Sequence, residues 1–325
     1  MKYITLFNNH SNYNTYITGN DKVLPNVSYC ENENEVHLNP WTDPKLVCKY
    51  NITDISSPTA LRTENEPNMF KSMEIDGVLL DSLVTSYQFN TTGEHTVKYE
   101  LYDETKVGNN APLFNGITTL TSASIPNSVT TIGNAAFHSC TGHISITIPN
   151  SVTSISQAIF NNCIGLTTIK VDSGNTVYDS RNNCNAIIET ATNTLIAGCK
   201  NTVIPNSVTT IGDYAFNLCT GLTSIIIPNF VTTIRQYAFG GCSGLTSITI
   251  PNSVTTIGNY TFSGCSGITS ITSMATTAPT IQSSTFYNVK TGGTLNVPTG
   301  STGYDVWMGT GNYYLGKYSW TKVEQ

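Results

Sequence analysis

Charged residues are scarce in this chain. They make up 11% of its 325 residues, against about 25% in a typical soluble protein. Coiled coils, long helices and charge-driven disorder all need far more Glu, Lys, Arg or Ala, so the composition excludes these classes. Thr, Ser, Asn and Gly fill the difference, which favours a mainly β fold with many turns.

The chain also lacks a cluster of basic residues and a long apolar run. Its net charge is −6, and without a Lys/Arg cluster we expect no nucleic-acid partner. No stretch approaches the about 20 apolar residues of a membrane span, so no membrane-spanning segment is expected. The first ten residues turn polar too early for a secretory signal, which needs an apolar run of about 7–15 residues. Either a signal has been removed or the protein reaches its destination without one, and both readings stay open.

Metal and cofactor motifs are missing as well. The chain has nine cysteines and five histidines but no C-x-x-C spacing, so a zinc site is not expected. His138 and His143 are five residues apart with no third ligand near them in the sequence. We therefore predict no metal and no cofactor. A disulfide between Cys184 and Cys199 is left open.

Carboxylates are rare over residues 108–300, where Asp172, Asp179, Glu189 and Asp213 are the only ones. Acid–base and nucleophilic catalysis need ionisable groups that converge in one pocket. We therefore expect that the protein is not an enzyme, with a carbohydrate-active enzyme as a minor alternative.

A sequence repeat occupies the same region, about residues 108–300, that is poor in carboxylates. The segment Ile-Pro-Asn-(Ser/Phe)-Val-Thr recurs with its isoleucine at positions 125, 148, 204, 227 and 250. The steps are 23, 56, 23 and 23 residues, and the long step accommodates a hairpin insert around 172–199. A fixed period of this length is typical of a solenoid.

One repeat predicts one coil of that solenoid. Leu245, Ile248 and Ile250 have the spacing of a short strand with one buried face, and Pro251 ends the strand because it lacks a backbone N–H. A unit of 23 residues buries too little apolar surface to fold alone. Stacked neighbours cover both faces of each coil, with strands about 4.8 Å apart.

Two columns recur at the same phase and are expected in the core. They are Phe137, Phe160, Phe216, Phe239 and Phe262, and Cys140, Cys163, Cys219, Cys242 and Cys265.

The residues between the buried isoleucines would point outward and form the binding face of the array. These candidate ligand-binding residues are Ser145, Thr147, Thr168, Lys170, Ser224, Ile226, Ser247, Thr249, Ser270 and Thr272.

The pattern L-x-x-I-x-I-P-N-x-V-x-x-I-G-x-x-x-F-x-x-C resembles the BspA-type (Treponema-type) leucine-rich repeat, and the hairpin insert resembles a repeat variant of Bacteroides-type bacteria. The resemblance covers about residues 108–300. It implies a cell-surface or secreted protein that binds an extracellular protein or glycan and acts in adhesion. The alternative is a virion-associated receptor-binding protein of a phage or prophage tail. Oligomeric state and ligand identity are left open.

The flanks differ from the repeats. Residues 1–107 hold 15 of the 21 acidic residues. The run Gly93–Leu101 resembles the last hairpin of bacterial Ig-like or PKD-like modules, which predicts a small Ig-like β-sandwich over 43–107. Residues 1–42 are expected to be an extended leader. Residues 301–325 are rich in aromatics and predict a C-terminal cap over the last coil, with a sugar-stacking patch as the alternative.

Overall fold

The computed structural model describes residues 27–29, 36–38, 45–63, 69–108 and 113–325. The chain divides into two units, residues 1–44 and 45–325. In the first unit, β1 (Val27–Tyr29) and β2 (Val36–Leu38) pair antiparallel. The rest of the leader expected over 1–42 lies outside the described residues.

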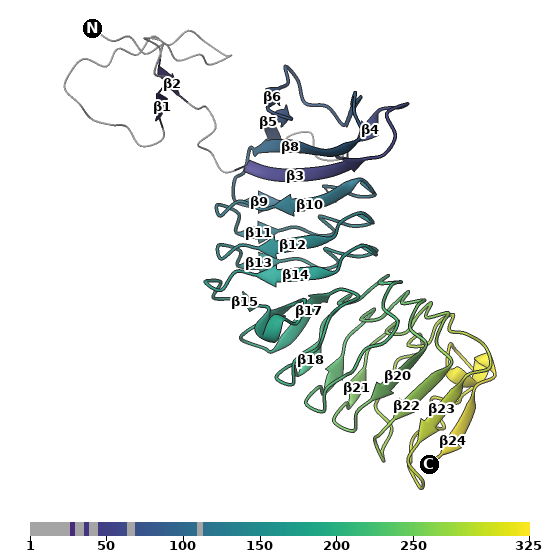
Figure 1. Cartoon of the computed structure of the whole chain (residues 1–325). Coiled ribbons are helices and arrows are strands. Elements are labelled where there is room, and N and C mark those ends of the chain that lie inside the picture. The colour runs from purple at the N-terminus through teal and green to yellow at the C-terminus, as the bar shows by residue number, and fades with distance from the viewer. Residues whose placement is uncertain (1–26, 30–35, 39–44, 64–68, 109–112) are drawn as a thin grey trace. The chain divides into compact units, whose positions relative to one another are not determined.

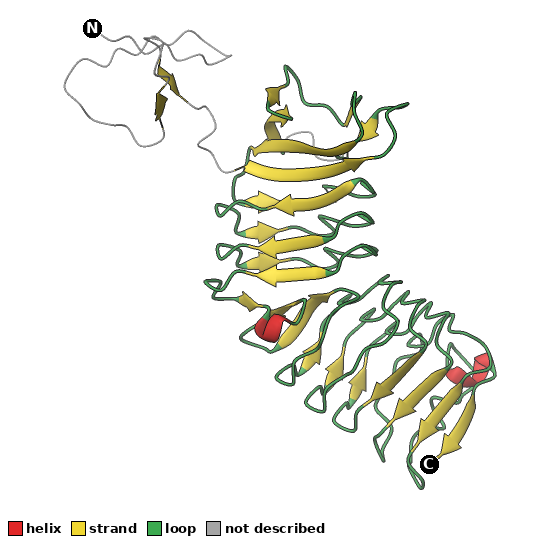
Figure 2. Ribbon diagram, viewed as in Figure 1, coloured by secondary structure: helices red, strands yellow, loops and turns green. Residues whose placement is uncertain are grey.

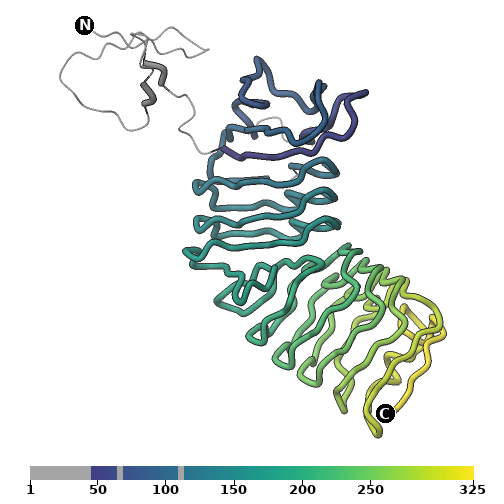
Figure 3. Tube along the Cα trace, viewed as in Figure 1, coloured from purple at the N-terminus to yellow at the C-terminus, as the bar shows by residue number. Residues whose placement is uncertain are grey.

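Coils stacked in register make up most of the second unit (Figure 1), and Figure 3 follows the winding path of the chain. Paired residues are one repeat apart, as Ile146 with Ile169 and Ile248 with Ile271. The fold is mainly β, because the helices in the described part are two short 3₁₀ turns, η1 (Arg181–Asn183) and η2 (Leu315–Tyr318) (Figure 2). The repeat therefore forms the solenoid that its period predicted.

Each coil contributes to two faces. On the first face, the parallel strands of the first coils are β10 (Leu120–Ser124), β12 (Ser145–Ile148) and β14 (Thr168–Val171). Further along the chain, this face has β20 (Ser247–Ile250), β22 (Ser270–Ser273), β23 (Thr294–Val297) and β24 (Thr321–Glu324).

The second face carries shorter strands. In the first coils these are β9 (Lys106–Val107), β11 (Thr131–Ile132) and β13 (Ser154–Ile155). After the insert they are β18 (Thr210–Ile211), β19 (Thr233–Ile234) and β21 (Thr256–Ile257).

The insert links the two series of coils. It contains β15 (Tyr178–Asp179), η1, β16 (Ala186–Glu189) and β17 (Thr194–Gly198), and β16 pairs antiparallel with both neighbours. Arg181 binds both carboxylate oxygens of Asp179 and donates to Asn193 Oδ1 at 2.8 Å. Cys184 and Cys199 are free thiols, so the disulfide left open by the sequence is not formed.

The core consists of rows that run from coil to coil. The phenylalanine rings of consecutive coils stack, with centroids 5.3 Å apart for Phe216 and Phe239 and 5.8 Å for Phe239 and Phe262. The cysteines lie beside them, and Cys242 Sγ donates to the carbonyl oxygen of Phe216 at 3.1 Å. All ten members of the two columns are less than 9% exposed.

The region expected to be a separate β-sandwich instead extends the solenoid. Here β3 (Lys45–Ile52), β8 (Gly93–Leu101), β5 (Phe70–Ile75) and β6 (Val78–Leu79) form one antiparallel series. Strand β3 then pairs with β10, so the series continues the sheet of the first coils. The buried side chains Tyr50 and Tyr99 belong to the same hydrophobic core as Phe114. A shorter pair, β4 (Thr59–Ala60) and β7 (Ser86–Tyr87), lies beside them. These strands therefore cap the open end of the first coil.

The C-terminal residues cover the other end of the stack. Tyr304 and Trp307 are at most 1% exposed, and Trp307 Nε1 donates to the carbonyl oxygen of Pro279 at 3.0 Å. Tyr304 Oη donates to Ser273 Oγ at 2.7 Å, which gives a buried serine its partner. These two enclosed rings belong to the cap, whereas Tyr313, Tyr314 and Tyr318 are only partly buried, so for them the sugar-stacking patch stays a prediction.

Among the described residues, no helix is long and apolar enough to cross a membrane.

Candidate functional site

The outward residues of the first strand face form the candidate site. Along β12 and β14 exposed and buried side chains alternate strictly, because successive residues of a strand point to opposite sides of the sheet. Ser145 therefore lies beside Thr168, and Thr147 beside Lys170, all four in solvent. The strands bring these four predicted residues together.

A shallow groove of about 460 Å³ opens on this face. Its polar lining includes the hydroxyl groups of Ser122, Ser124, Ser145 and Thr147. The turns after β10 and β12 contribute Pro126, Asn127 and Pro149, and Asp172 follows β14. The result is a groove with a hydroxyl-lined strand surface beside proline turns.

The sequence predicted Ser145 and Thr147 of the groove but missed its other lining residues, among them Ser122, Ser124 and Asp172. Ser122 and Ser124 lie one period before Ser145 and Thr147 and pair with them in register. Extending the repeat one coil towards the N-terminus would have found both residues. Asp172 carries no repeat signal, because it lies where the chain leaves the pattern for the insert.

The charges near the groove differ from those on the cap. On the cap strands, Lys49 pairs with Glu94 at 2.7 Å and Lys98 with Glu74 at 2.6 Å. Within the described residues, Lys170 and Asp172 have no ion-pair partner. One free cation and one free anion at the groove are thus available to a ligand.

The later coils present a second part of the same face. Ser247 and Thr249 of β20 are exposed. Ser270 and Thr272 of β22 are half-buried, because Asn296 Nδ2 donates to their hydroxyl oxygens at 3.1 and 3.4 Å. These two predicted residues are therefore occupied by an internal contact.

Ser224 and Ile226 are exposed, but the structure does not place them on a strand. Residues 222–228 belong to no strand. The face is consequently interrupted between β14 and β20, which the uniform repeat did not predict.

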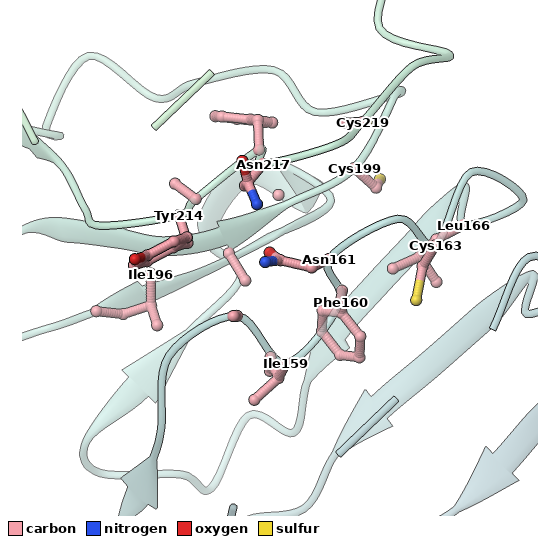
Figure 4. Close-up of a pocket in the computed structure, with 15 residues that line it drawn as sticks. Ile159, Phe160, Asn161, Cys163, Leu166, Ile196, Cys199, Tyr214, Asn217 and Cys219 are labelled. Carbon is pink, nitrogen blue, oxygen red and sulfur yellow. The ribbon is translucent and has the colours of Figure 1, made fainter. Parts of the chain in front are cut away.

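A small cavity of about 10 Å³ lies where the insert meets the coils, which is room for about one water molecule. Figure 4 shows Phe160, Asn161, Cys163, Tyr214 and Asn217 around it. Burial raises the pKa of the Cys163 thiol to about 12, so this thiol stays protonated. The lining brings together no acid–base pair of the kind that catalysis needs.

Across the part of the chain that the structure describes, no group of three or more His, Cys, Asp or Glu side chains could hold a metal ion.

Comparison with known families identifies the repeat region. A profile described as "BspA type Leucine rich repeat region" matches residues 105–197 and 193–304, in six copies. No curated protein matches the chain.

Several solved structures match the chain at low identity. A leucine-rich repeat protein from Eubacterium ventriosum is 24% identical over 61% of this chain and 53% of its own, with a TM-score of 0.46. A leucine rich cell surface protein from Faecalibacterium prausnitzii is 24% identical over 65% of this chain and 60% of its own, with a TM-score of 0.40. The pneumococcal vaccine antigen PcpA is 16% identical over 63% of this chain and 67% of its own, with a TM-score of 0.39. The chain thus spans little more than half the length of the first two.

Proposed function

Because this chain belongs to the BspA-type leucine-rich repeat family, we propose that it is a non-enzymatic binding protein that acts at the bacterial cell surface or in secreted form. Its ligand is an extracellular protein or glycan, and its role is attachment. The assignment to Bacteroides-type bacteria stays a prediction from the repeat variant.

The observation that carries the proposal is the groove on the first strand face. Its hydroxyl groups are short and already ordered by the sheet, so binding would restrict few side-chain rotamers. Lys170 and Asp172 beside it offer one charge of each sign. Such a surface suits a ligand with many hydroxyl or amide groups, which both glycans and polypeptides have.

The test uses the full chain, because residues 45–107 share the core of the first coils. The purified protein is applied to an array of glycans and matrix proteins, and each positive ligand is then titrated. Thr147→Arg fills the groove with a long charged side chain. Ser154→Arg makes the same change at an exposed site of the same coil, on strand β13 of the other face.

We expect Thr147→Arg to lower the affinity for the array ligand at least tenfold. Ser154→Arg should change this affinity less than twofold. Equal affinity of the two variants, or no ligand on the array, would contradict the proposal.

A further inference from the structure

A row of tyrosine side chains crosses the coils that follow the insert. Tyr214, Tyr237 and Tyr260 are half-buried and lie one repeat apart in the sequence. Their rings are nearly parallel, with interplanar angles of 8° for Tyr214 and Tyr237 and 9° for Tyr237 and Tyr260. The ring centroids of these two pairs are 5.0 and 4.7 Å apart. These three residues, which we call the tyrosine row, therefore stack from coil to coil while each keeps part of its surface in water. Tyr214 begins the row beside the small cavity (Figure 4).

The coil does not need a tyrosine at this position. In two coils before the insert the same position holds Ala135 and Ala158, and the backbone there is left-handed, with φ of 51° and 60°. Tyr237 has the same conformation, with φ of 52°. The turn thus forms with a methyl group alone, and the rings are an addition in the coils after the insert.

The hydroxyl groups of the tyrosine row are not used by the fold. None of the three makes a hydrogen bond within the part of the chain that the structure describes, and none of their oxygens is buried. Other tyrosines of the stack differ, since Tyr178 Oη accepts from the Ile155 N–H at 3.1 Å and Tyr304 Oη is bound to Ser273. The phenol groups of the row are consequently open to a reagent in solution.

Parallel phenol rings at this distance are placed for oxidative coupling. An oxidant removes the phenolic hydrogen, as one electron and one proton, from each of two tyrosines. In each ring the unpaired electron spreads to the carbons next to the hydroxyl-bearing carbon, and one such carbon of each ring joins the other in a new C–C bond. The two ring hydrogens at these carbons then move to the oxygens and restore both phenols. Hydrogen peroxide, acting through a haem peroxidase, takes up the two electrons and two protons and becomes two water molecules.

We propose that the tyrosine row is a modification site, at which a peroxidase and hydrogen peroxide join neighbouring coils through a dityrosine bond. Tyr237 is the shared member, because it stacks on both Tyr214 and Tyr260. The inference goes beyond the proposed binding function, since the groove takes no part in the reaction.

The geometry also predicts which tyrosines couple poorly. Tyr287 lies next to Tyr260, but its ring is turned by 69° and its centroid is 6.1 Å away. The ring carbons of this pair do not face each other as they do in a parallel stack, so coupling should be rarer. Tyr102 is 60% exposed and contacts no other aromatic ring among the described residues. It should therefore couple only between separate chains.

The new bond would reinforce a part of the stack that lacks ladder strands on the first face. Residues 222–228 lie between Tyr214 and Tyr237 in the chain and belong to no strand. A covalent link between two distant points of a chain restricts the unfolded state and so favours the folded one. A link to Tyr237 would thus hold this coil to its neighbour where the first face does not.

The test treats the full chain with a haem peroxidase and hydrogen peroxide. Unlabelled chain is mixed with an equal amount of chain labelled with heavy nitrogen, because links within a chain join peptides of one label and links between chains mix the labels. A protease that cuts between the three tyrosines releases the joined peptides, and mass spectrometry identifies them by the loss of two hydrogen atoms. Tyr237→Phe and Tyr260→Phe are the matched variants, since each keeps the stacked ring and removes only the hydroxyl.

We expect same-label links between Tyr237 and Tyr260 and between Tyr214 and Tyr237, each at least tenfold more abundant than a link between Tyr260 and Tyr287. Tyr260→Phe should leave the link between Tyr214 and Tyr237 in place. Oxidation should raise the midpoint of urea unfolding of the unaltered chain but not that of Tyr237→Phe.

Three results would overturn the inference. They are the absence of same-label links within the tyrosine row, an equal yield of the link between Tyr260 and Tyr287, and an equal rise of the urea midpoint in oxidised Tyr237→Phe. The outcome is independent of the array experiment, because Thr147→Arg and the tyrosine variants change different surfaces of the stack.

Discussion

His143 occupies a position that leucine holds in other coils, such as Leu222 and Leu245. Its side chain is fully buried, packs on Phe137 with ring centroids 5.4 Å apart, and makes no hydrogen bond through either ring nitrogen. Burial is the larger influence and lowers the pKa of His143 to about 4, while the nearby Ser145 backbone acts in the opposite direction. A core position has thus become a titratable one.

We predict that stability depends on pH through His143. Because its folded pKa lies near 4 and its unfolded pKa near 6.5, the unfolded state binds the proton more readily between these values. Stability is therefore complete above pH about 6.5 and falls by up to about 1.4 kcal/mol for each pH unit as the pH drops towards 4.

Urea unfolding of the unaltered chain and of His143→Leu measures this effect. Their difference in unfolding free energy should grow as the pH falls from 6.5 to 4 in favour of leucine. If the difference in unfolding free energy between the two chains stays constant from pH 6.5 to 4, His143 is not the source of the pH dependence.

A second prediction at this scale compares two phenylalanines. Phe239 is fully buried between two stacked rings, so Phe239→Ala should cost about 3–5 kcal/mol of unfolding free energy. Phe230 is 64% exposed, so Phe230→Ser should change it by less than about 0.5 kcal/mol. Denaturant titration of both variants tests the pair, and equal losses would place Phe230 in the core.

The repeat glycine Gly258 shows what a repeat pattern can and cannot reveal about a single residue. A glycine at the fixed repeat position 258 predicts a bend before the aromatic column, because glycine adopts backbone angles that other residues avoid. In the structure the left-handed residue is Tyr260, with φ of 56°. Gly258 is needed for a different reason, because a Cβ there would lie 2.5 Å from the backbone nitrogen of Gln236. The sequence identifies the position as special but does not distinguish a turn from a close approach.

Among the elements, the cysteine column acts as a row of hydrogen-bond donors. Cys140, Cys163, Cys242 and Cys265 each donate to the carbonyl oxygen of a phenylalanine one coil earlier. Burial raises the pKa of Cys219 and Cys265 to about 12. Since the thiolate is the reactive form, these groups should be inert while the coils are stacked.

We therefore expect the native chain to expose at most one thiol to Ellman's reagent. Eight cysteines are buried and free, and the ninth, Cys30, lies outside the described residues. Nine thiols should react after denaturation in guanidinium chloride. Rapid reaction of several thiols in the native chain would mean that the column is not enclosed.

The N-terminal strands show why element order alone does not give the domain architecture. The residues Val47–Ile52 predict a strand, and the alternation over His95–Leu101 predicts another; both lie within observed strands, β3 and β8. Alternation says which side of a strand is buried but not which sheet it joins. The partner of β3 is β10, more than 60 residues later, and that long-range pairing leaves no local signal.

The interrupted face has a similar explanation. Ser224 and Ile226 follow the same spacing as residues on β20, so the period predicted a strand there. The insert between β14 and β18 shifts how the next coils meet, and the ladder of the first face is lost over residues 222–228 while that of the second face continues through β18 and β19. Ladder formation depends on neighbouring coils, which a single repeat does not encode.

On the scale of the whole molecule, the stack needs both ends covered. The cap strands bring Leu46, Tyr50 and Tyr99 over the first coil, and the C-terminal cap brings Trp307 over the last. A solenoid without such caps exposes its apolar interior to water.

We predict that a chain beginning at residue 108 is poorly soluble, whereas one beginning at residue 45 behaves as the full chain does. Removing residues 45–107 strips β3 from β10 and leaves the edge of this five-residue strand unpaired, and unpaired sheet edges promote aggregation. Size-exclusion chromatography and thermal unfolding of the two truncated chains decide the point. A monomeric, cooperative unfolding of the 108–325 chain would show that the cap strands are a separate module.

The central claim is that in-register coils present a laddered strand face on each side of one interval, between β14 and β20, that has no ladder strands on this face. Hydrogen–deuterium exchange with mass spectrometry measures it directly on the full chain. We expect slow exchange for the amides of 145–148, 168–171, 247–250 and 270–273, and fast exchange for those of 223–227. Exchange of 145–148 and 247–250 as fast as that of 223–227 would contradict the ladder, and with it the binding face.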